Sequence, residues 1–276
     1  MNIFKDKITI VTGGASGIGR ALCEGLAGYG AAVTVADIDG PGAKAVADGI
    51  AARGGRAEPA ALDVSDRDAF AGLIDAVAAR HGRLDYLFNN AGISLGGEVR
   101  DMTPEQWRRI IDVNLMGVLN GTTAAYGVML GQGAGHIVNI ASYLGLVSPP
   151  LTAAYNMTKF AVVGLSRSLR HEAAGLGVKV STVCPGYIRT NLIERGTMLH
   201  VSPADIIDMI PFRLLRVEKA VRPILKGVAR NRELIVFPFH ARLLWRLYRA
   251  APSALVPLFR SSVEKFRVKR GGKIRK

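Results

Sequence analysis

Short apolar runs alternate with helical patterns along most of the chain. The apolar runs are Lys7–Val11, Ala31–Ala36, a segment ending at Leu62-Asp63-Val64, Leu84–Asn89 and His136–Ala141. The helical patterns between them are an Ala/Leu-rich one through Leu26, Ala43–Arg53 and Asp66–His81. Apolar strands that alternate with helices of this length predict right-handed crossovers and a parallel sheet covered on both faces.

A further helix is expected after Thr103. Thr103 supplies an N-cap, Pro104 suits the first helical position, and Gln106 completes a capping box. The apolar positions that follow are Trp107, Ile110, Ile111 and Val113. Asn114 lies near the middle of this pattern, and an amide in such a place is by itself typical of a hydrogen-bonded core residue.

The first strand-to-helix turn is rich in glycine. Residues Thr12–Gly19 read T-G-G-A-S-G-I-G. A strand that turns through glycines into a helix brings backbone N–H groups and the positive end of the helix dipole to one point, which suits a pyrophosphate. Gly13 permits the tight turn, Gly17 lets phosphates approach the backbone, and Gly19 lets the helix pack closely on the sheet.

Two residues near this turn favour NAD over NADP. Asp37 ends the second apolar run, 18 residues after Gly19. A carboxylate in that place accepts hydrogen bonds from a ribose 2′-hydroxyl and repels a 2′-phosphate. Ser16 occupies the position before Gly17, where a basic side chain could meet that phosphate.

Two later strand ends are predicted to border the same groove. Asp63 and Val64 end one strand, where an adenine ring could rest. Asn89-Asn90-Ala91-Gly92 ends the next strand with small residues. Because the carboxyl ends of parallel strands lie at one edge of the sheet, we expect both segments beside the dinucleotide.

The stretch from Ser142 to Lys159 carries candidate acid–base chemistry. If the part after Pro150 is helical, Tyr155 and Lys159 stand on one face, four residues apart, and Ser142 arrives from the preceding strand. A phenol has a pKa of about 10, and a Lys cation roughly 5 Å away at an effective dielectric of about 20 favours the phenolate by about 3 kcal/mol. That shift of about two pKa units makes Tyr155 a usable proton donor and acceptor. Taken alone, the pattern is also typical of a half-buried aromatic beside a solvated lysine.

The composition is typical of a compact α/β enzyme with one domain. The 276 residues are 49% hydrophobic and 21% charged, and no linker, repeat or low-complexity stretch divides them. The two cysteines and five scattered histidines show neither a disulfide framework nor a metal-ligand spacing, so we expect a reducing compartment and no metal site. With no signal-peptide core and no apolar run of membrane-spanning length, the protein is expected to be cytoplasmic.

The net charge of +14 lies entirely in the C-terminal part. Residues 1–212 hold 18 Lys/Arg and 19 Asp/Glu, whereas residues 213–276 hold 18 Lys/Arg and 3 Asp/Glu. The run Glu233–Phe239 is expected to be the last strand. The final stretch, Lys269–Lys276, is expected to be disordered. Nucleic acid is not an expected partner, because no recognised binding fold accompanies the charge.

A basic amphipathic helix is expected after the last strand. On such a helix Arg242, Arg246 and Arg249 form one stripe, whereas the other side and its boundary hold Leu243, Leu244, Leu247, Tyr248 and Trp245. An anionic membrane surface or an acidic partner attracts such a helix, which would make the protein peripheral to a membrane. Packing on its own subunit or across a dimer interface, with the arginines in water, explains the pattern equally well.

The chain resembles the short-chain dehydrogenase/reductase family over most of residues 5–191. The motifs occur in the family's order: Thr12–Gly19, Asp63-Val64, Asn89–Gly92, Asn114, Ser142 with Tyr155 and Lys159, and Pro185-Gly186. The resemblance implies a Rossmann-type doubly wound parallel sheet of about seven strands. We expect residues 1–240 to form this dinucleotide-binding and catalytic domain, and residues 241–276 to be its basic helical extension.

The resemblance also implies a reaction and its residues. Hydride passes between the nicotinamide C4 and a carbinol or carbonyl carbon. Tyr155 is then the general acid/base, Ser142 polarises the substrate oxygen, Lys159 holds the nicotinamide ribose and lowers the Tyr155 pKa, and Asn114 anchors a water that relays protons. The implied cofactor-binding residues are Gly13, Ser16, Gly17, Ile18, Gly19, Asp37, Asp63, Val64, Asn90, Ala91, Gly92, Tyr155, Lys159, Pro185, Gly186 and Thr190.

Beyond Thr190 the family pattern loosens. Residues Asn191–Pro211 are expected to form a lid, and the candidate pocket walls are Leu95, Tyr143, Leu144, Leu151, Tyr187, Leu192, Ile193, Met198 and Leu199. We find no surplus cation for a charged substrate group, so the predicted substrate is an uncharged hydrophobic secondary alcohol or ketone, of aryl, steroid-like or lipid-like type.

We therefore expect an NAD-dependent short-chain alcohol dehydrogenase or ketone reductase that forms a homodimer or homotetramer. Three alternatives stay open. One is a membrane-surface lipid or fatty-acyl carbonyl reductase, and another is an epimerase or dehydratase on the same scaffold. The third is a dinucleotide-sensing protein without catalysis, which has little need for Ser142, Tyr155 and Lys159 together.

Overall fold

The computed structural model describes residues 2–194, 196–202, 204–205, 212 and 214–271. The predicted lid residues 195, 203 and 206–211 and the predicted disordered residues 272–276 lie outside the described residues. In the described part of the chain, no helix combines the length and the apolar character needed to cross a membrane.

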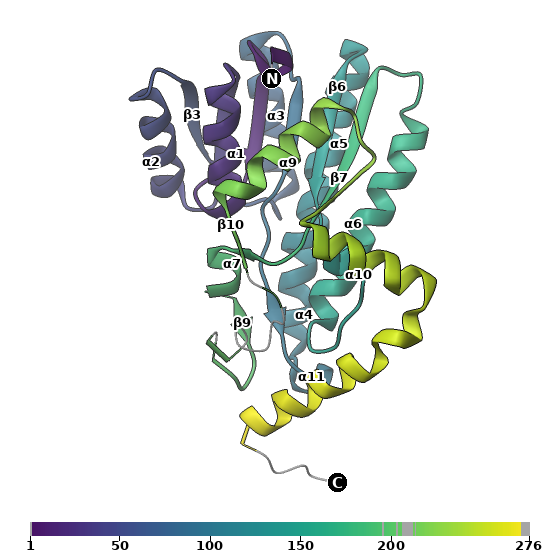
Figure 1. Cartoon of the computed structure of the whole chain (residues 1–276). Helices are drawn as coiled ribbons and strands as arrows, with labels where there is room; N and C mark the ends of the chain where they lie inside the picture. Colours follow the sequence, from purple (N-terminus) through teal and green to yellow (C-terminus); the bar gives the residue numbers. More distant parts are fainter. Residues whose placement is uncertain (1, 195, 203, 206–211, 213, 272–276) are drawn as a thin grey trace.

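The described residues form a central seven-stranded sheet in the order β11-β7-β6-β4-β1-β2-β3, and every neighbouring pair is parallel (Figure 1). The strands are β1 (Ile8–Thr12), β2 (Ala32–Asp37), β3 (Arg56–Ala61), β4 (Tyr86–Asn89), β6 (Gly135–Ile140), β7 (Val178–Pro185) and β11 (Leu234–Phe237). After β3 the chain returns to the other side of β1, so the strand order reverses between β1 and β4. The predicted fold is confirmed, and ligands bind outside the strand ends at such a reversal.

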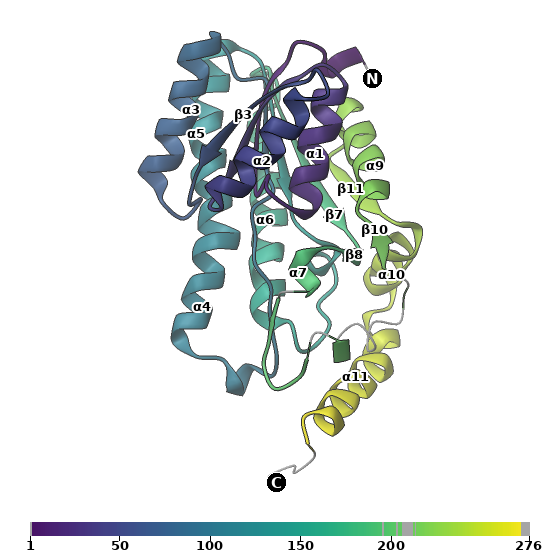
Figure 2. The same ribbon diagram turned by 90° about the vertical axis from the view of Figure 1, so that its left-hand side faces the viewer.

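Helices cover both faces of this sheet (Figure 2). One face packs against α1 (Gly17–Gly28), α2 (Gly40–Ala51) and α9 (Glu218–Ala229). The other packs against α3 (Arg67–His81), α5 (Gly117–Gln132) and the end of α6 (Ala153–Glu172). Because both faces are buried, most strands read as continuous apolar runs in the sequence.

Two elements differ from their predicted form. β3 ends at Ala61, short of the predicted end at Val64, and the Asp63 side chain accepts a hydrogen bond from Ser65 N at 2.9 Å in the turn that follows. The predicted capping box at Thr103 is confirmed, but α4 (Pro104–Ile111) passes into a π-helical turn, Asp112–Met116. Such a turn inserts a residue into the helix, and it is this turn that carries Asn114.

After β11 the chain continues beyond the carboxyl end of the sheet (Figures 1 and 2). α10 (Phe239–Ala250), a 3-10 turn (Pro252–Leu255) and α11 (Val256–Lys269) follow in order. The apolar side of α10 is not the one predicted from the sequence. Leu244 and Tyr248 pack inward as expected, but Leu243 and Leu247 are exposed, because Ala241 and Trp245 share the inward face with the first pair.

Ion pairs fasten the end of α11 to the segment after β5 (Leu95–Gly96). Arg267 donates to Glu98 with Nη2 at 2.6 Å from Oε1, and Arg270 donates to Glu98 Oε2 at 3.0 Å and Asp101 Oδ1 at 2.9 Å. Burial raises the pKa of Glu98, but the hydrogen bonds from its arginines outweigh burial and leave this pKa below its usual range. The predicted disorder from Lys269 onward is therefore wrong for Lys269, which ends α11, and for Arg270.

A buried histidine predicts how the fold responds to acid. His136 on β6 is 4% exposed, its Nε2 lies 2.9 Å from Ser181 Oγ, and burial, aided by Lys179 and Arg170, lowers its pKa to about 3. An unfolded chain binds this proton near pH 6.5. The unfolded state thus holds more protons between pH 6.5 and 3, and the free energy of unfolding should fall by about 1.4 kcal/mol per pH unit as the pH drops through that window.

Urea unfolding of the parent and of His136→Gln at several pH values tests this expectation. The variant should be less stable than the parent at pH 7, since it disturbs a buried hydrogen bond, but its stability should depend less on pH below 6.5. His81→Gln, at the exposed end of α3, is the matched control and should keep the parent's slope. A His136→Gln slope equal to the parent's would contradict the assignment.

Candidate active site

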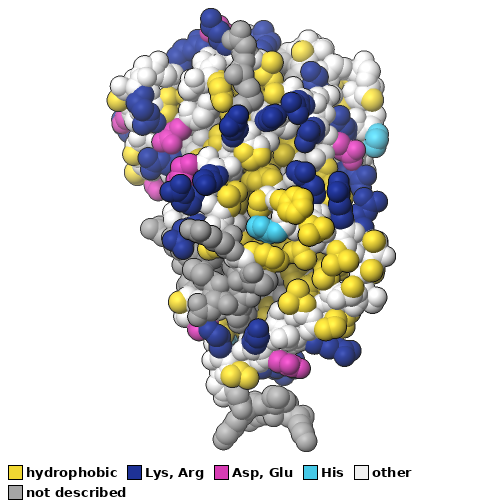
Figure 3. Space-filling view, viewed as in Figure 1, with side chains coloured by type: hydrophobic (Ala, Val, Ile, Leu, Met, Phe, Trp, Pro, Cys, Tyr) yellow, Lys and Arg dark blue, Asp and Glu magenta, His cyan; other side chains and the backbone are white. Residues whose placement is uncertain are grey.

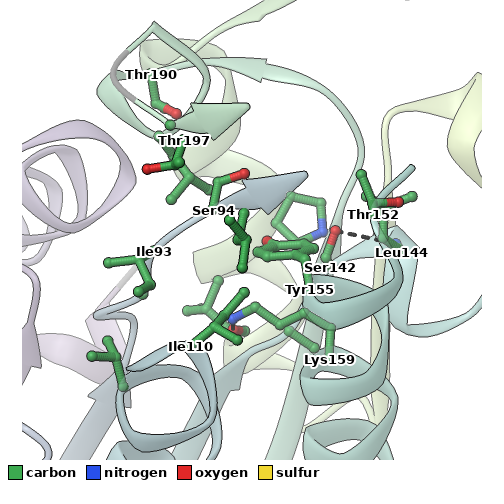
Figure 4. Close-up of a pocket in the computed structure, with 18 of the residues that line it drawn as sticks. Ile93, Ser94, Ile110, Ser142, Leu144, Thr152, Tyr155, Lys159, Thr190 and Thr197 are labelled. Atoms are coloured by element: carbon green, nitrogen blue, oxygen red, sulfur yellow. Dashed lines mark hydrogen bonds between the residues drawn. The ribbon is translucent and has the colours of Figure 1, made fainter. Parts of the chain in front are cut away.

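Three side chains of the predicted catalytic set come together at the carboxyl end of the sheet (Figure 4). Ser142 follows β6 and caps the 3-10 turn Tyr143–Gly145, where its Oγ accepts a hydrogen bond from Leu144 N at 3.1 Å. Tyr155 and Lys159 lie one turn apart on α6, as predicted from their spacing. All three line the same cavity.

Burial dominates the electrostatics of Tyr155. Its side chain lies deep in the wall of the cavity, and burial raises its pKa to about 12, while hydrogen bonding to Ser142 acts in the opposite direction. Lys159 Nζ lies 5.6 Å from the centre of the Tyr155 ring. The predicted net lowering of the Tyr155 pKa by this lysine is therefore not found in the protein by itself, because desolvation on folding outweighs the effect of the nearby charge.

Lys159 is placed to exchange protons. Its side chain is 3% exposed, and Nζ donates a hydrogen bond to the carbonyl oxygen of Ile140 at 3.1 Å. Burial lowers the pKa of Lys159 to about 8. An ammonium group that loses its proton so close to neutrality is suited to pass protons to and from its neighbours.

Asn114 supports the site without lining the cavity. Its Oδ1 accepts a hydrogen bond from Ile93 N at 2.8 Å, and its Nδ2 donates to Ile93 O at 2.9 Å. A Cβ built on Gly92 would lie 3.2 Å from Asn114 Oδ1 and 3.6 Å from Lys159 Nζ, so both polar groups approach the loop at this glycine. The π-helical turn thus fixes the loop after β4 against α6.

The glycine turn is held in shape by β4. The Oγ1 of Thr12 accepts hydrogen bonds from Asn90 N at 3.0 Å and from Ala91 N at 3.1 Å. Asn90 Nδ2 donates back to Thr12 O at 2.9 Å. Gly13 and Gly17 have φ values of 66° and 53°, which side chains other than glycine adopt at a cost. Thr12 was not predicted to have a role, although its place at the end of a buried strand marks it as an anchor for the turn.

Asp37 lies where a ribose hydroxyl is expected. Its Oδ2 accepts a hydrogen bond from Ala15 N at 2.9 Å and its Oδ1 accepts one from Asp39 N at 3.0 Å. Each carboxylate oxygen keeps lone pairs for further donors. The carboxylate therefore lies beside the glycine turn and lines the cavity.

One cavity of about 1190 Å³ connects the two halves of the site. It is lined by all of the predicted cofactor-binding residues except Gly19, together with Ser142. Gly19 instead packs against Gly13 and Asn90 beneath the turn. One end of this groove presents backbone N–H groups at a helix N-terminus, with a carboxylate beside them. A phenol and an ammonium group lie further along. This arrangement fits a nicotinamide dinucleotide.

Most predicted pocket walls line this cavity. They are Leu95, Tyr143, Leu144, Leu151, Tyr187, Leu192 and Met198. Leu199 does not, because its side chain packs on Gly97, and the side chain of Ile193 lies outside the described residues. In the predicted lid, α7 (Asn191–Glu194) precedes β9 (Thr197–Met198), which pairs with β5 beside the pocket.

The C-terminal extension supplies walls that sequence analysis missed. Leu244 of α10, Leu255 of the 3-10 turn, and Leu258, Phe259 and Ser262 of α11 line the cavity. The spacing of the α11 residues at one helical turn was the available signal. That spacing indicates that these residues share one face of the helix, but it does not tell which other part of the chain this face packs against.

Comparisons with known proteins give matches over most of the chain. Residues 7–197 match the family described as short chain dehydrogenase. The putative oxidoreductase SadH of Mycobacterium tuberculosis is 35% identical over 271 residues, which cover 96% of this chain and 98% of that protein. A short chain dehydrogenase/reductase from Burkholderia phymatum in complex with NAD is 30% identical, covers 92% of this chain and 96% of its own, and gives a TM-score of 0.84.

A second solved structure holds the other dinucleotide. It is a putative NAD(P) dependent gluconate 5-dehydrogenase from Beutenbergia cavernae with bound NADP, 35% identical, with a TM-score of 0.75. It covers 84% of this chain and 94% of that one. Similar structures therefore hold either NAD or NADP, and the choice between them rests on local residues.

Proposed function

The chain belongs to the short-chain dehydrogenase/reductase family, and on this premise we propose that it uses NAD to interconvert an uncharged, apolar secondary alcohol and its ketone. Membership makes it an oxidoreductase that depends on NAD or NADP. The observation that carries the finer proposal is the single cavity that joins Asp37, the Ser142–Tyr155–Lys159 cluster and an apolar wall from the C-terminal helices.

The proposed proton path begins at Tyr155. In the oxidative direction its phenolate takes the proton of the substrate hydroxyl, while the Ser142 hydroxyl donates a hydrogen bond to the same oxygen. The neutral amine of Lys159 then accepts the proton that Tyr155 must lose to return to the phenolate, which the Lys159 pKa of about 8 allows near neutral pH. A nicotinamide held beside these residues would supply a hydride acceptor for the carbinol carbon, and the positive charge of its oxidised form would favour the phenolate of Tyr155.

Cofactor preference is proposed to depend on Asp37. Replacing Asp37 with Ala should lower the ratio of kcat/KM for NAD to that for NADP by at least about 10-fold, since juxtaposed like charges cost several kcal/mol. Steady-state kinetics with both dinucleotides measures this ratio. Asp75→Ala, an exposed carboxylate of α3, should leave it unchanged. A parent enzyme that already prefers NADP would overturn the proposal.

The substrate class rests on apolar side chains that line the same cavity as Tyr155. Leu95, Leu144, Leu151, Leu255 and Phe259 present hydrocarbon to the cavity. Buried apolar area rewards an apolar ligand by about 25 cal/mol per Å². We therefore propose that the substrate is aryl, steroid-like or lipid-like.

A screen of secondary alcohols and ketones, with NAD and NADP in parallel, tests the proposed function. Apolar substrates should give steady NADH production or consumption, and polyols and hydroxy acids should not. An epimerase or dehydratase would change its substrate without net NADH turnover. A best substrate bearing a carboxylate or phosphate would overturn the proposed substrate class.

A further inference from the structure

The outward face of α10 is apolar although nothing in the described chain packs on it. Phe239, Leu243 and Leu247 follow one another at four-residue spacing and are 75%, 56% and 41% exposed. Their inward neighbours, Leu244 and Tyr248, pack against the core, so Phe239, Leu243 and Leu247 are not needed to hold the helix there. Figure 3 shows hydrophobic side chains gathered over α10, with Lys and Arg side chains bordering them.

Three arginines flank this line of apolar side chains. Arg242, Arg246 and Arg249 are exposed on the same helix. Arg242 donates a hydrogen bond to Val236 O at 3.1 Å, and the Arg249 guanidinium lies 5.4 Å from the Trp245 ring centre. Neither contact neutralises a charge, and no Asp or Glu occurs between Glu233 and Glu264.

We propose that this face of α10 docks on an anionic lipid bilayer, with Phe239, Leu243 and Leu247 in the acyl boundary and the arginines among the headgroups. An amphipathic helix with apolar and cationic surfaces side by side binds at the interface through both. Each Lys or Arg near an anionic surface strengthens partition about fivefold. The helix lies on the surface, because no described helix has the length and apolar character to cross it.

Charge argues against a second copy of the chain as the occupant. A twofold contact places the same patch on both subunits, so the arginines of both copies would be gathered in one interface. Segment 213–276 holds 18 Lys/Arg against 3 Asp/Glu and offers few acids to compensate them. An anionic bilayer supplies the missing charge.

Docking would leave only the thickness of α10 between the bilayer and the substrate cavity. Leu244, on the inward face of α10, lines that cavity. An apolar substrate dissolved in the bilayer would then be concentrated beside the wall that encloses the site. This consequence rests on the proposed function, whereas the docking itself does not.

Sedimentation with vesicles at low salt tests the docking without substrate or dinucleotide. The full chain should sediment with equal parts phosphatidylcholine and phosphatidylglycerol, not with phosphatidylcholine alone, and high salt should release it. Phe239→Gln with Leu243→Gln and Leu247→Gln should weaken partition at least about 100-fold, and Arg246→Gln with Arg249→Gln about 30-fold.

Matched controls separate this face from general effects of apolarity and charge. Leu176→Gln, at a 50% exposed leucine beyond α6, and Arg67→Gln on α3 should bind as the parent does. Urea midpoints confirm that each variant is folded. Absence of binding, equal binding to both vesicles, or variants that bind like the parent would overturn the proposal. So would a parent dimer in sedimentation velocity that the triple variant dissociates, because the face would then join two copies.

Discussion

Tyr155→Phe is expected to lower turnover by at least about 10²-fold and to leave dinucleotide binding within a few-fold of the parent. The variant keeps the ring that fills the wall of the cavity and loses only the hydroxyl that exchanges a proton with the substrate. Because this interaction forms with the reacting oxygen, the loss should fall on kcat more than on KM. Single-turnover kinetics and titration with NAD measure the two effects separately.

The control for this variant is Tyr126→Phe. Tyr126 is a half-buried residue on α5 that packs on the core and does not line the cavity. The Tyr126→Phe substitution also removes one tyrosine hydroxyl, but at a site outside the cavity, and it should leave kcat unchanged. Turnover of Tyr155→Phe within a few-fold of the parent would show that another group moves the proton.

Gly19→Ala is expected to weaken dinucleotide binding by at least about 100-fold. The added Cβ would overlap the carbonyl oxygen of Gly13 and lie 2.5 Å from Asn90 Nδ2. The turn must then move away from the helix N-terminus. Loss of two hydrogen bonds to a charged pyrophosphate, each worth about 1.5–3 kcal/mol, gives this magnitude.

The Gly19→Ala variant should also have a lower free energy of unfolding than the parent. Overpacking in a closely packed turn costs about 1–3 kcal/mol, which urea unfolding can resolve. Gly28→Ala is the control, since it lies at the other end of α1 and an added Cβ there meets nothing within 4 Å. That variant should bind as the parent does and be as stable or up to about 1 kcal/mol more stable. Equal affinities of the two variants would contradict close packing at Gly19.

The parts of the fold that follow from local chemistry were predicted from the sequence. The capping box at Thr103, the glycine turn and the four-residue spacing of Tyr155 and Lys159 are each set by neighbours in the chain, and all are present in the structure. The parallel sheet follows from strands buried on both faces, which makes their sequences continuously apolar.

The remaining features depend on contacts between distant segments. The π-helical turn places Asn114 where it accepts a hydrogen bond from Ile93, 21 residues away along the chain. The periodicity of the sequence gives no sign of this turn. The inward face of α10 was assigned in part wrongly, because Leu243 and Leu244 are equivalent in hydropathy and only packing distinguishes them. The Tyr155 pKa was placed too low for the same reason, since its burial is a property of the folded chain.

The ion pairs of α11 have a consequence for the order in which the protein is completed. During synthesis all seven strands leave the ribosome before α11, and a chain tends to fold from its N-terminal part onward. The dinucleotide half of the groove can form from these strands and their loops. The substrate half gains its α11 wall last, and we expect it to close only when Arg267 and Arg270 reach Glu98 and Asp101. A nascent chain should therefore be able to hold its dinucleotide before it can enclose a substrate.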